Sequence, residues 1–332
     1  MNKLNVAHLQ RRPFPGYYSI EGQFELIRRH MPHDIACTPW VCPNLSKGVL
    51  PRLSNARAAA LVQADVYHVT GDVHYLTRFL PRERTVLTVH DCVFLRQTSG
   101  LRRLFIRKLF YEWAVPRAAV VTVISEATRR ELEALVPAVK GKLVLIPCCV
   151  GDEFAFSPAR LWPERPAVLM VGTKENKNIV RMVQALAGLS VTLHIVGTLS
   201  DTQVRALVSS GLTWRNSPEL DRAGMVSAYR DCDLLAFAST YEGFGLPIVE
   251  AQATGRPVLT SEACSMPEAS GGAAVLVNPL DIASIRSGAE RVLGDAALRI
   301  ELIKRGRANA ARFEPSRVSA MHAALYHALG SK

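Results

Sequence analysis

Short runs of apolar, mostly β-branched residues alternate along this chain with segments whose apolar positions recur at helical spacing. In the first half, the short runs predict strands at Leu4–Leu9, Asp65–Thr70, Thr85–His90, Ala119–Ile124 and Lys142–Ile146. The helical spacing predicts helices at Ile20–Met31, Ser54–Ala64, Leu101–Val115 and Glu126–Val136, the last of which is capped by Ser125.

The second half repeats this rhythm. It predicts strands at Ala167–Val171, Val191–Val196, Asp233–Ala238, Pro257–Thr260 and Ala273–Val277. Three helical segments close the chain, at Ile282–Leu293, Ala296–Arg312 and Pro315–Leu329. Continuous apolar strands joined by helices are typical of parallel sheets covered on both faces. The pattern therefore predicts an α/β protein with doubly wound parallel sheets.

The two halves are separated by Gly151–Pro166, which has three prolines and no periodicity and is therefore expected to be a linker. The predicted domains are residues 1–150 and 167–312, with 313–332 forming a C-terminal helix that packs back on the first domain. Two doubly wound domains joined by a linker form a cleft at the carboxyl ends of their strands, where ligands bind. No G-x-G-x-x-G motif follows a predicted strand, so a classical dinucleotide site is not expected.

The net charge of +11 is concentrated in the first half. Residues 1–150 contain 21 Lys and Arg against 11 Asp and Glu, whereas residues 151–332 contain 19 against 18. An uneven basic charge suits an anionic partner, which can be nucleic acid, anionic lipid or a phosphorylated substrate; a general contribution to solubility is the alternative. No Arg-rich tract or stacking motif is present, so we expect no nucleic-acid partner.

The richest candidate site is the stretch YEGFGLPIVEAQA, from Tyr241 to Ala253, which follows a predicted strand. Pro247 suits the first position of a helix, which makes Leu246 the N-cap. A leucine side chain cannot cap, so the N–H groups at this helix start stay available. Gly243 and Gly245 let another molecule approach the backbone. The pattern predicts an anion site, with the helix dipole favouring phosphate.

Glu242 and Glu250 flank this loop. We expect Glu250 to lie in the first helical turn and to point into the cleft. A carboxylate accepts two hydroxyl hydrogen bonds in a fixed geometry, which suits a sugar. Alternatively, Glu250 merely complements the helix dipole and Glu242 is solvated. The neighbouring glycines and Pro247 favour the functional interpretation.

The segment E-G-F-G-L-P-x-x-E-A-x-A-x-G-x-P-V, which starts at Glu242, resembles the E-x7-E signature of family 4 of the retaining GT-B glycosyltransferases, also called glycosyl transferases group 1. The resemblance implies two Rossmann-like domains facing a cleft. It implies that Glu242 contacts sugar hydroxyls near the reacting carbon and that Glu250 binds the ribose hydroxyls of a nucleotide. The backbone of Gly243, Phe244, Gly245 and Leu246 would then receive donor oxygens.

A second segment, VGTKENKNIVRMVQAL, resembles the part of the family that meets the donor diphosphate at a helix start. Lys177 and Asn178 match its Lys-Asn pair, and Thr173 is a further donor-binding candidate. The Arg that usually precedes this Lys is Asn176 here, and the loop looks one residue short. One positive charge on the diphosphate is therefore missing, or Lys174 supplies it.

Two landmarks of the family fall in the first half. His90, in TVHDCVFL, matches a histidine beside the donor sugar. In PFPGYYSIEGQF, Gly16 is the best match for a Gly-Gly pair on the donor phosphate, although Gly22 stands apart from it. This loop is also expected to shape the acceptor site.

Two further features have competing interpretations. Asp231-Cys232-Asp233 reads as D-x-D, a metal-nucleotide motif of another glycosyltransferase fold, but it precedes a predicted strand instead of following one. We therefore expect no metal. The stretch Leu101–Arg117 is a basic amphipathic helix, which either lies on an anionic membrane surface or packs on its domain with a charged outer face.

These features predict a retaining glycosyltransferase. It would move a hexose from a nucleotide diphosphate sugar, with a lean to GDP-mannose, to a glycan or lipid-diphosphate-linked acceptor in cell-surface polysaccharide or lipopolysaccharide assembly. Lys177 and the helix start would stabilise the departing diphosphate, without metal or cofactor, and cleft closure would be a hinge motion at Gly151–Pro166. A nucleotide-sugar 2-epimerase of the same fold and a catalytically silent nucleotide-sugar-binding module are the alternatives.

The sequence also indicates a location. The longest apolar runs are far shorter than the roughly 20 residues of a membrane span, and the N-terminus MNKLNVAHLQRR lacks the order of a signal peptide. The seven cysteines include no C-x-x-C pair, which favours reduced thiols. We expect a cytoplasmic protein that contacts the inner face of the cytoplasmic membrane through its basic N-terminal domain.

Overall fold

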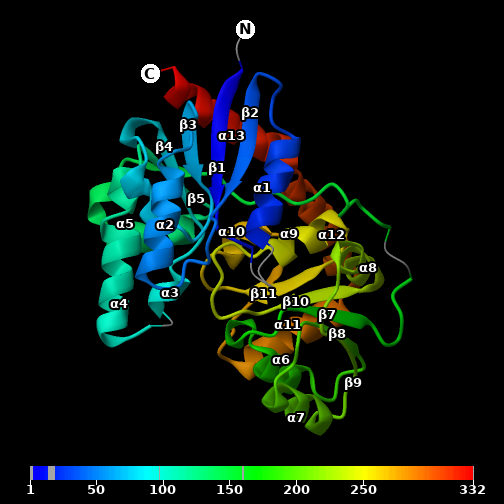
Figure 1. Cartoon of the computed structure of the whole chain (residues 1–332). Coiled ribbons are helices and arrows are strands. Elements are labelled where there is room, and N and C mark those ends of the chain that lie inside the picture. Colours follow the sequence, from blue (N-terminus) through cyan, green and yellow to red (C-terminus); the bar gives the residue numbers. More distant parts are fainter. Residues whose placement is uncertain (1–2, 14–18, 97, 159–160, 332) are drawn as a thin grey trace. The chain divides into compact units, whose positions relative to one another are not determined.

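A computed structural model describes residues 3–13, 19–96, 98–158 and 161–331 of the chain (Figure 1). The chain forms two compact units, each with its own sheet and hydrophobic core. Unit 1 consists of Met1–Cys149 together with Pro315–Lys332, and unit 2 consists of Val150–Glu314. Gly16 lies outside the described residues.

The sheet of unit 1 is parallel and has six strands among the residues described. They are β1 (Leu4–Gln10), β2 (Ile35–Val41), β3 (Val66–Val69), β4 (Thr85–Val89), β5 (Val120–Val123) and β6 (Leu143–Leu145). Their order is β2-β1-β3-β4-β5-β6. This is a doubly wound order in which the chain changes direction between β1 and β3, the point at which such sheets bind ligands.

The helices of unit 1 vary in length and type. The α-helices are α1 (Ser19–Arg29), α2 (Val49–Ala59), α3 (Val93–Arg96), α4 (Gly100–Ile106), α5 (Glu126–Leu135) and α13 (Pro315–Gly330). The shorter turns are η1 (His74–Phe79), η2 (Arg82–Arg84), the π-helical η3 (Arg107–Glu112), η4 (Val115–Arg117) and η5 (Pro137–Val139). Ser125 caps α5 as the sequence predicts, because its side chain accepts from the N–H of Thr128 at 3.1 Å.

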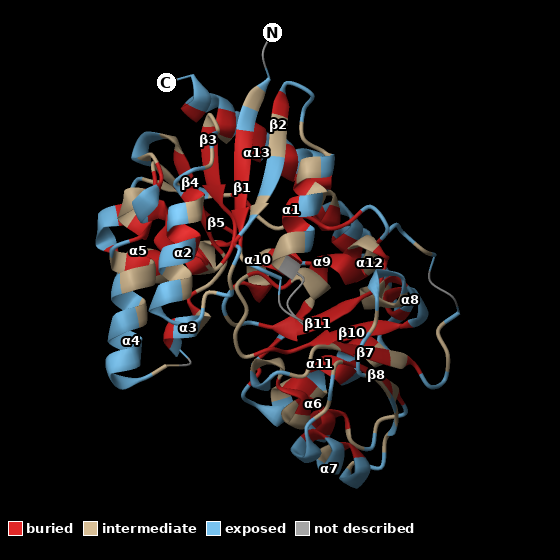
Figure 2. Ribbon diagram, viewed as in Figure 1, coloured by how far each residue is buried: buried red, intermediate tan, exposed pale blue. Residues whose placement is uncertain are grey.

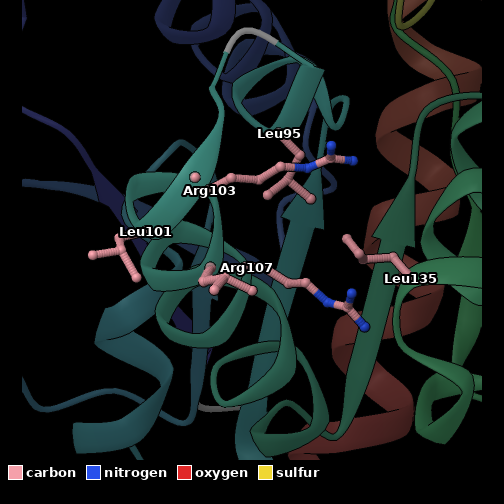
Figure 3. A pocket seen from close by; sticks show the side chains of 7 residues that line it. Leu95, Leu101, Arg103, Arg107 and Leu135 are labelled. Atoms are coloured by element: carbon pink, nitrogen blue, oxygen red, sulfur yellow. The ribbon is translucent and has the colours of Figure 1, made fainter.

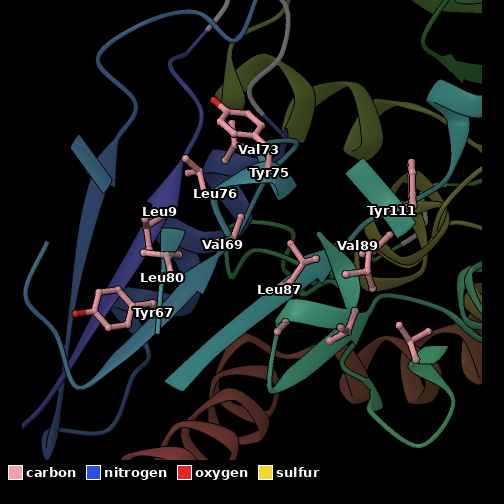
Figure 4. Packing of buried hydrophobic residues seen from close by; sticks show 14 of the residues in the cluster. Leu9, Tyr67, Val69, Val73, Tyr75, Leu76, Leu80, Leu87, Val89 and Tyr111 are labelled. Carbon is pink, nitrogen blue, oxygen red and sulfur yellow. The ribbon is translucent and has the colours of Figure 1, made fainter. Parts of the chain in front are cut away.

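Both faces of the unit 1 sheet are buried, because all residues of β1 from Val6 to Gln10 are buried although successive side chains point to opposite faces (Figure 2). Ala7 and Leu9 join a core with residues of α2, η1 and α5; Figure 4 shows part of this cluster around Leu76 and Leu87. Val6 faces the opposite side and packs with Tyr326 of α13. The last helix of the chain is therefore part of the core of unit 1.

Unit 2 also has a parallel six-stranded sheet in its described residues. The strands are β7 (Ala167–Val171), β8 (Thr192–Val196), β9 (Thr213–Ser217), β10 (Leu234–Phe237), β11 (Val258–Ser261) and β12 (Val275–Val277). Their order is β12-β11-β10-β7-β8-β9. This is the order of the classical dinucleotide-binding fold, with its switch point between β7 and β10.

Helices follow nearly every strand of unit 2. They are η6 (Glu175–Lys177), α6 (Ile179–Leu186), α7 (Asp201–Ser209), α8 (Arg222–Asp231), α9 (Leu246–Ala253), α10 (Met266–Ser270), α11 (Ile282–Gly294), α12 (Ala296–Ala310) and η7 (Ala311–Phe313). Helices α6 and α11 pack together over one core that includes Leu193, Leu234 and Leu259. Residues 151–158 and 161–166, in the predicted linker, contain no helix or strand.

The ten predicted strands are confirmed within a few residues, but β2 and β9 were not predicted. Both are edge strands. Strand β2 contains Pro39, and β9, TWRNS, is half-exposed and polar. An edge strand forms backbone hydrogen bonds with a neighbouring strand on one side only, so it tolerates proline and polar residues. Neither β2 nor β9 therefore shows the apolar run by which a strand is predicted.

Two predicted helices differ from the structure. The helix expected at Ser54–Ala64 is α2, which begins at Val49 after Gly48 and ends at Ala59. Its exposed Val49 and Leu50 lie outside the core pattern that periodicity detects. The helix expected at Leu101–Val115 is divided into α4, the wide turn η3 and η4, where Pro116 cannot continue an α-helix.

Candidate functional site

The switch point of the unit 2 sheet carries the candidate residues of both predicted donor segments. Strands β7 and β10 are neighbours, although β8 and β9 lie between them in sequence. The loop after β7 leads to Lys177, and the loop after β10 leads to Glu242. Topology therefore brings these two residues together, which the sequence alone did not show.

Glu242 is held by donors from the other loop. Its Oε1 accepts hydrogen bonds from Lys177 Nζ at 2.6 Å and from Asn176 Nδ2 at 3.2 Å. Its backbone carbonyl accepts from Ser265 Oγ at 2.9 Å. The side chain keeps 15% of its surface exposed, so the carboxylate is fixed yet open to a ligand.

Lys177 lies at the end of the 3-10 turn η6 and is partly buried. Its ammonium group is 4.6 Å from the centre of the Phe237 ring, which stabilises the cation from the other side. Gly172 has a φ of +87°, and a Cβ there would lie 2.9 Å from Lys177 Cε. The glycine therefore allows the lysine stem to pass close to the end of β7.

Thr173 and Asn178 are both engaged by the protein. Thr173 Oγ1 donates to the carbonyl of Thr198 at 2.6 Å. Asn178 is buried, adopts a left-handed conformation and donates through Nδ2 to the carbonyls of Ala238 and Pro279. The Asn178 side chain thus fixes the start of the loop after β10, which leads to Glu242.

The start of α9 lies immediately after Glu242, and the predicted cap is shifted by one residue. Gly245 is the N-cap, Leu246 the first helical residue and Pro247 the second. Gly245 has a φ of +103°, a conformation that leucine rarely adopts, so the chain enters the helix one residue earlier than predicted. Within the described residues, no side chain caps this helix start. The anion site is therefore expected at the same place.

The remaining loop residues have side chains that are absent, buried or partly buried. The Phe244 side chain is buried and meets the ring of Phe313 edge to face, with 5.4 Å between ring centres. Gly243 has no side chain, and Leu246 is partly buried. Any contact of these three residues with a ligand would be made mainly by main-chain groups.

Glu250 lies in the second turn of α9, and this corrects the prediction of a first-turn residue. The difference arises because the N-cap of α9 is Gly245 and not Leu246, so the helix starts one residue earlier. Glu250 is 5% exposed, and its Oε2 accepts from the hydroxyl of Tyr229 at 2.7 Å. Burial raises the pKa of Glu250 above its ordinary value, whereas Tyr229 and Arg222 oppose that rise.

His90 lies in unit 1, directly after β4. Its Nε2 bonds to the carbonyl of Thr70 at 2.9 Å, which fixes the ring at the carboxyl end of the sheet. Burial raises the pKa of the neighbouring Asp91.

The switch point of unit 1 holds a second charged cluster. Arg11, which follows β1, binds Glu21 at 2.7 Å and Asp72 at 2.6 Å. The three side chains are largely buried. The ion pair of Arg11 with Asp72 depends on the order of the strands, because Asp72 follows β3, the neighbour of β1 in the sheet.

The D-x-D sequence has a structural role in part. Asp233 directly precedes β10, and its Oδ2 accepts from the N–H of Ala167 at 2.8 Å, which joins two strand starts. In the described part of the chain, no three His, Cys, Asp or Glu side chains are grouped as ligands of a metal ion. All seven cysteines lie within the described residues, and none of them is in a disulfide bond.

Sequence comparison gives the family. Residues 13–154 match the model of Glycosyltransferase Family 4, and residues 165–295 match that of Glycosyl transferases group 1. The two models together cover most of the chain. The chain therefore belongs to the family 4 glycosyltransferases.

Curated relatives include mannosyltransferases of Escherichia coli. The serotype-specific mannosyltransferase WbdA is 25% identical over 260 residues, which are 69% of this chain and 32% of the relative. The O-antigen chain mannosyltransferase B is 28% identical over 275 residues, or 75% of this chain and 70% of the relative. The chain thus spans about a third of the length of WbdA.

A solved structure supports the GT-B fold. Anabaena HepE, in a complex with UDP and glucose, is 16% identical with a TM-score of 0.74, and the similarity covers 98% of this chain and 100% of that one. Each unit accordingly has a Rossmann-like fold.

Proposed function

We propose that the protein is a retaining hexosyltransferase that uses a nucleotide diphosphate sugar. The observation that carries this proposal is the pairing of Lys177 with Glu242 beside the uncapped start of α9. A cation, a carboxylate and a helix N-terminus meet there at a switch point, which suits a diphosphate joined to a sugar. The UDP and glucose in the HepE structure support this ligand class.

In the proposed reaction, the bond from the anomeric carbon to the donor phosphate breaks and a bond to an acceptor hydroxyl forms. The acceptor proton passes to the leaving phosphate, so neither metal nor cofactor is needed. Lys177 would leave Glu242 for the phosphate and stabilise its growing charge, together with the N–H groups at the start of α9. Glu242 would then be free to accept sugar hydroxyls.

The names of the relatives favour mannose as the transferred sugar and a cell-surface glycan as the product. We propose GDP-mannose as the donor and a glycan or lipid-diphosphate-linked acceptor in O-antigen or other lipopolysaccharide assembly. The basic unit 1 would receive the acceptor, because its charge suits a phosphate group. Transfer that is unaffected by removal of the lipid diphosphate would contradict this part of the proposal.

The test is to incubate the protein with a panel of nucleotide sugars and to follow release of nucleoside diphosphate with and without candidate acceptors. A transferase releases it with an acceptor, a 2-epimerase isomerises the sugar without one, and a silent binding module does neither. We expect Glu242→Ala and Lys177→Ala each to abolish transfer without loss of the fold. Near-normal turnover in both variants would disprove the site assignment.

We also propose that unit 1 contacts the inner face of the cytoplasmic membrane through α4. Leu101, Leu104 and Phe105 are exposed, Leu101 by 85%, beside Arg103 and Arg107. These arginines line a pocket of about 520 Å³. Figure 3 shows them there together with leucines, among them Leu95 and Leu135. Exposed leucines among arginines suit an anionic lipid surface. Throughout the described residues, no helix is both long and apolar enough to cross a bilayer.

Vesicle flotation tests this contact. We expect binding to vesicles with anionic lipid and its loss in the double variant Arg103→Glu, Leu104→Ser. The matched control is Arg57→Glu, Leu61→Ser, which changes an exposed arginine and an exposed leucine near the end of α2. Equal binding by both double variants would exclude α4 as the contact.

A further inference from the structure

Tyr229 is a fully buried tyrosine of α8 to which the proposed reaction gives no role. Its hydroxyl donates to Glu250 Oε2 at 2.7 Å. Its ring meets the ring of Phe154 edge to face, with 5.5 Å between centres. The tyrosine is therefore held by an aromatic contact on its ring and by a hydrogen bond from its hydroxyl to a carboxylate.

Arg222 approaches the other oxygen of the same carboxylate. Its Nη1 is 3.7 Å from Glu250 Oε1. The guanidinium lies 4.6 Å from the centre of the Phe154 ring and forms an ion pair with Glu153. Arg222 comes from the first turn of α8 and Tyr229 from its third, so one helix reaches both carboxylate oxygens.

Gly151 lies close to the ion pair between Glu153 and Arg222. A Cβ on Gly151 would lie 2.3 Å from Glu153 Oε2 and 2.6 Å from Arg222 Nη2. A side chain at this position would therefore push the ends of Glu153 and Arg222 away from the places they occupy beside Glu250. Burial alone would favour the neutral form of Glu250, and a hydrogen-bond donor and a cation both favour the charged form.

We propose that Tyr229 and Arg222 are positioning residues that keep Glu250 ionised and oriented, with Oε2 engaged inside the protein and Oε1 available to the ribose hydroxyls of the donor nucleotide. The inference rests on the proposed function and deepens it. It assigns the recognition of the nucleoside to α8 as well as to α9.

The consequence is a pH dependence of nucleotide binding. Protonation removes the acceptor charge of Glu250, so affinity is lost as the pH falls through the pKa of this carboxyl group. Tyr229→Phe removes a hydrogen bond to the charged form, and Arg222→Met removes a neighbouring cation. Each variant should raise that pKa, so the acid limb of binding should move to higher pH.

The experiment measures the affinity of the full chain for GDP and for UDP between pH 5 and pH 8 by calorimetry. We expect the acid limb to move upward by about one pH unit in Tyr229→Phe, with about tenfold weaker binding inside that interval. Arg222→Met should move the limb in the same direction, and Glu250→Gln should abolish it. A merely structural loss would weaken binding equally at every pH and leave the limb in place.

Matched controls separate these outcomes. Tyr67→Phe removes another buried hydroxyl, which donates to the carbonyl of Val62, and Arg205→Met removes an exposed arginine of α7; neither should move the limb. Should Tyr229→Phe fail to fold, Arg222→Met decides the question, because Arg222 is half-exposed. If the wild type binds nucleotide but the variants leave the acid limb where it is in the wild type, this inference alone is overturned. If the wild type binds neither nucleotide, the proposed function is overturned too.

Discussion

Asn176 stands where the family pattern has an arginine, and its side chain reaches the residue that most needs positioning. Its Nδ2 donates to Glu242 Oε1 at 3.2 Å and to the carbonyl of Tyr241 at 2.9 Å. Its own carbonyl accepts from the N–H of Thr240 at 2.8 Å. Asn176 thus joins the loop after β7 to the loop after β10 by backbone and side chain together.

The hydrogen bonds of Asn176 show what stands in place of the arginine of the family pattern. An amide supplies a hydrogen bond without charge, so Lys177 is the cation paired with Glu242. When Lys177 moves to a donor phosphate, Asn176 would still hold the carboxylate. Asn176, which replaces the usual arginine, is therefore an uncharged partner for Glu242. The charge of a donor phosphate attracts it less strongly than it attracts Lys177.

We predict that Asn176→Ala lowers kcat by tenfold or more, because it removes a hydrogen bond to a charged group worth roughly 1.5–3 kcal/mol. The KM for the donor should change little, since Lys177 remains. Steady-state kinetics with GDP-mannose measure both constants. Asn216→Ala is the control, because that amide also bridges two backbone carbonyls of unit 2. A kcat equally reduced in both variants would contradict a specific role for Asn176.

At the scale of elements, the sequence predicts what local chemistry determines. Ser125 before α5 is such a case, because the cap and the helix are neighbours in sequence. The N-cap of α9 was misplaced by one residue, since it depends on the backbone of Gly245, and that shift moved Glu250 to the second turn. The loop of the donor site could thus be predicted, but the depth of Glu250 could not.

The contacts of the site were beyond prediction for another reason. Lys177 and Glu242 are 65 residues apart, and their meeting depends on the pairing of β7 with β10. Tyr229 lies on a helix whose sequence gives no sign of a buried partner. Such pairs follow from strand order and helix packing, which a pattern of apolar positions leaves open.

We predict that Ser125→Ala lowers the free energy of unfolding of unit 1 by about 1 kcal/mol, because the first turn of α5 loses its cap. Urea unfolding followed by circular dichroism measures the change. Ser99→Ala is a matched control, because Ser99 precedes α4 but makes no capping hydrogen bond with its side chain. Equal destabilisation by both substitutions would show that the Ser125 cap contributes little.

At the scale of the whole chain, its two ends meet inside unit 1. Helix α13 brings His322 and Tyr326 against His8 of β1 and His68 of β3. The Tyr326 hydroxyl shares hydrogen bonds with His8 Nε2 at 2.9 Å and His68 Nδ1 at 2.7 Å. A polar network thus fastens the last helix to the first sheet.

The groups around this network all matter to its titration. His68 Nε2 bonds to Thr88 of β4. Arg28 of α1 lies 3.4 Å from His8 Nδ1, and Cys37 of β2 is close to Arg28 and Tyr326. His90 also interacts electrostatically with His68. Burial lowers the pKa of His8, and the Arg28 cation lowers it further. Burial also lowers the pKa of His68, with smaller contributions from the neighbouring histidines, and it lowers the pKa of His322 to about 3.

The sign of the pH effect follows from these directions. Below an ordinary pKa of about 6.5, the unfolded chain binds protons that the buried histidines do not bind. The contribution of these neutral histidines to the free energy of unfolding of unit 1 therefore has its full value above about pH 6.5. It decreases as the pH falls below that value. Each histidine contributes up to about 1.4 kcal/mol per pH unit, and for His322 the decrease continues toward pH 3.

We predict that His322→Phe flattens this decrease by about 1.4 kcal/mol per pH unit below pH 6. The phenyl ring keeps the stacking on Tyr326 but cannot be protonated. His322 Nδ1 is buried and has no hydrogen-bond partner among the described residues, so its loss should not reduce stability at pH 7.5. Urea unfolding of unit 1 at a series of pH values measures the slope. His33→Gln, at an exposed site, should leave the slope unchanged. A slope in His322→Phe as steep as in the wild type would mean that His322 is already charged in the folded protein, and that the junction of α13 with the sheet tolerates a buried cation.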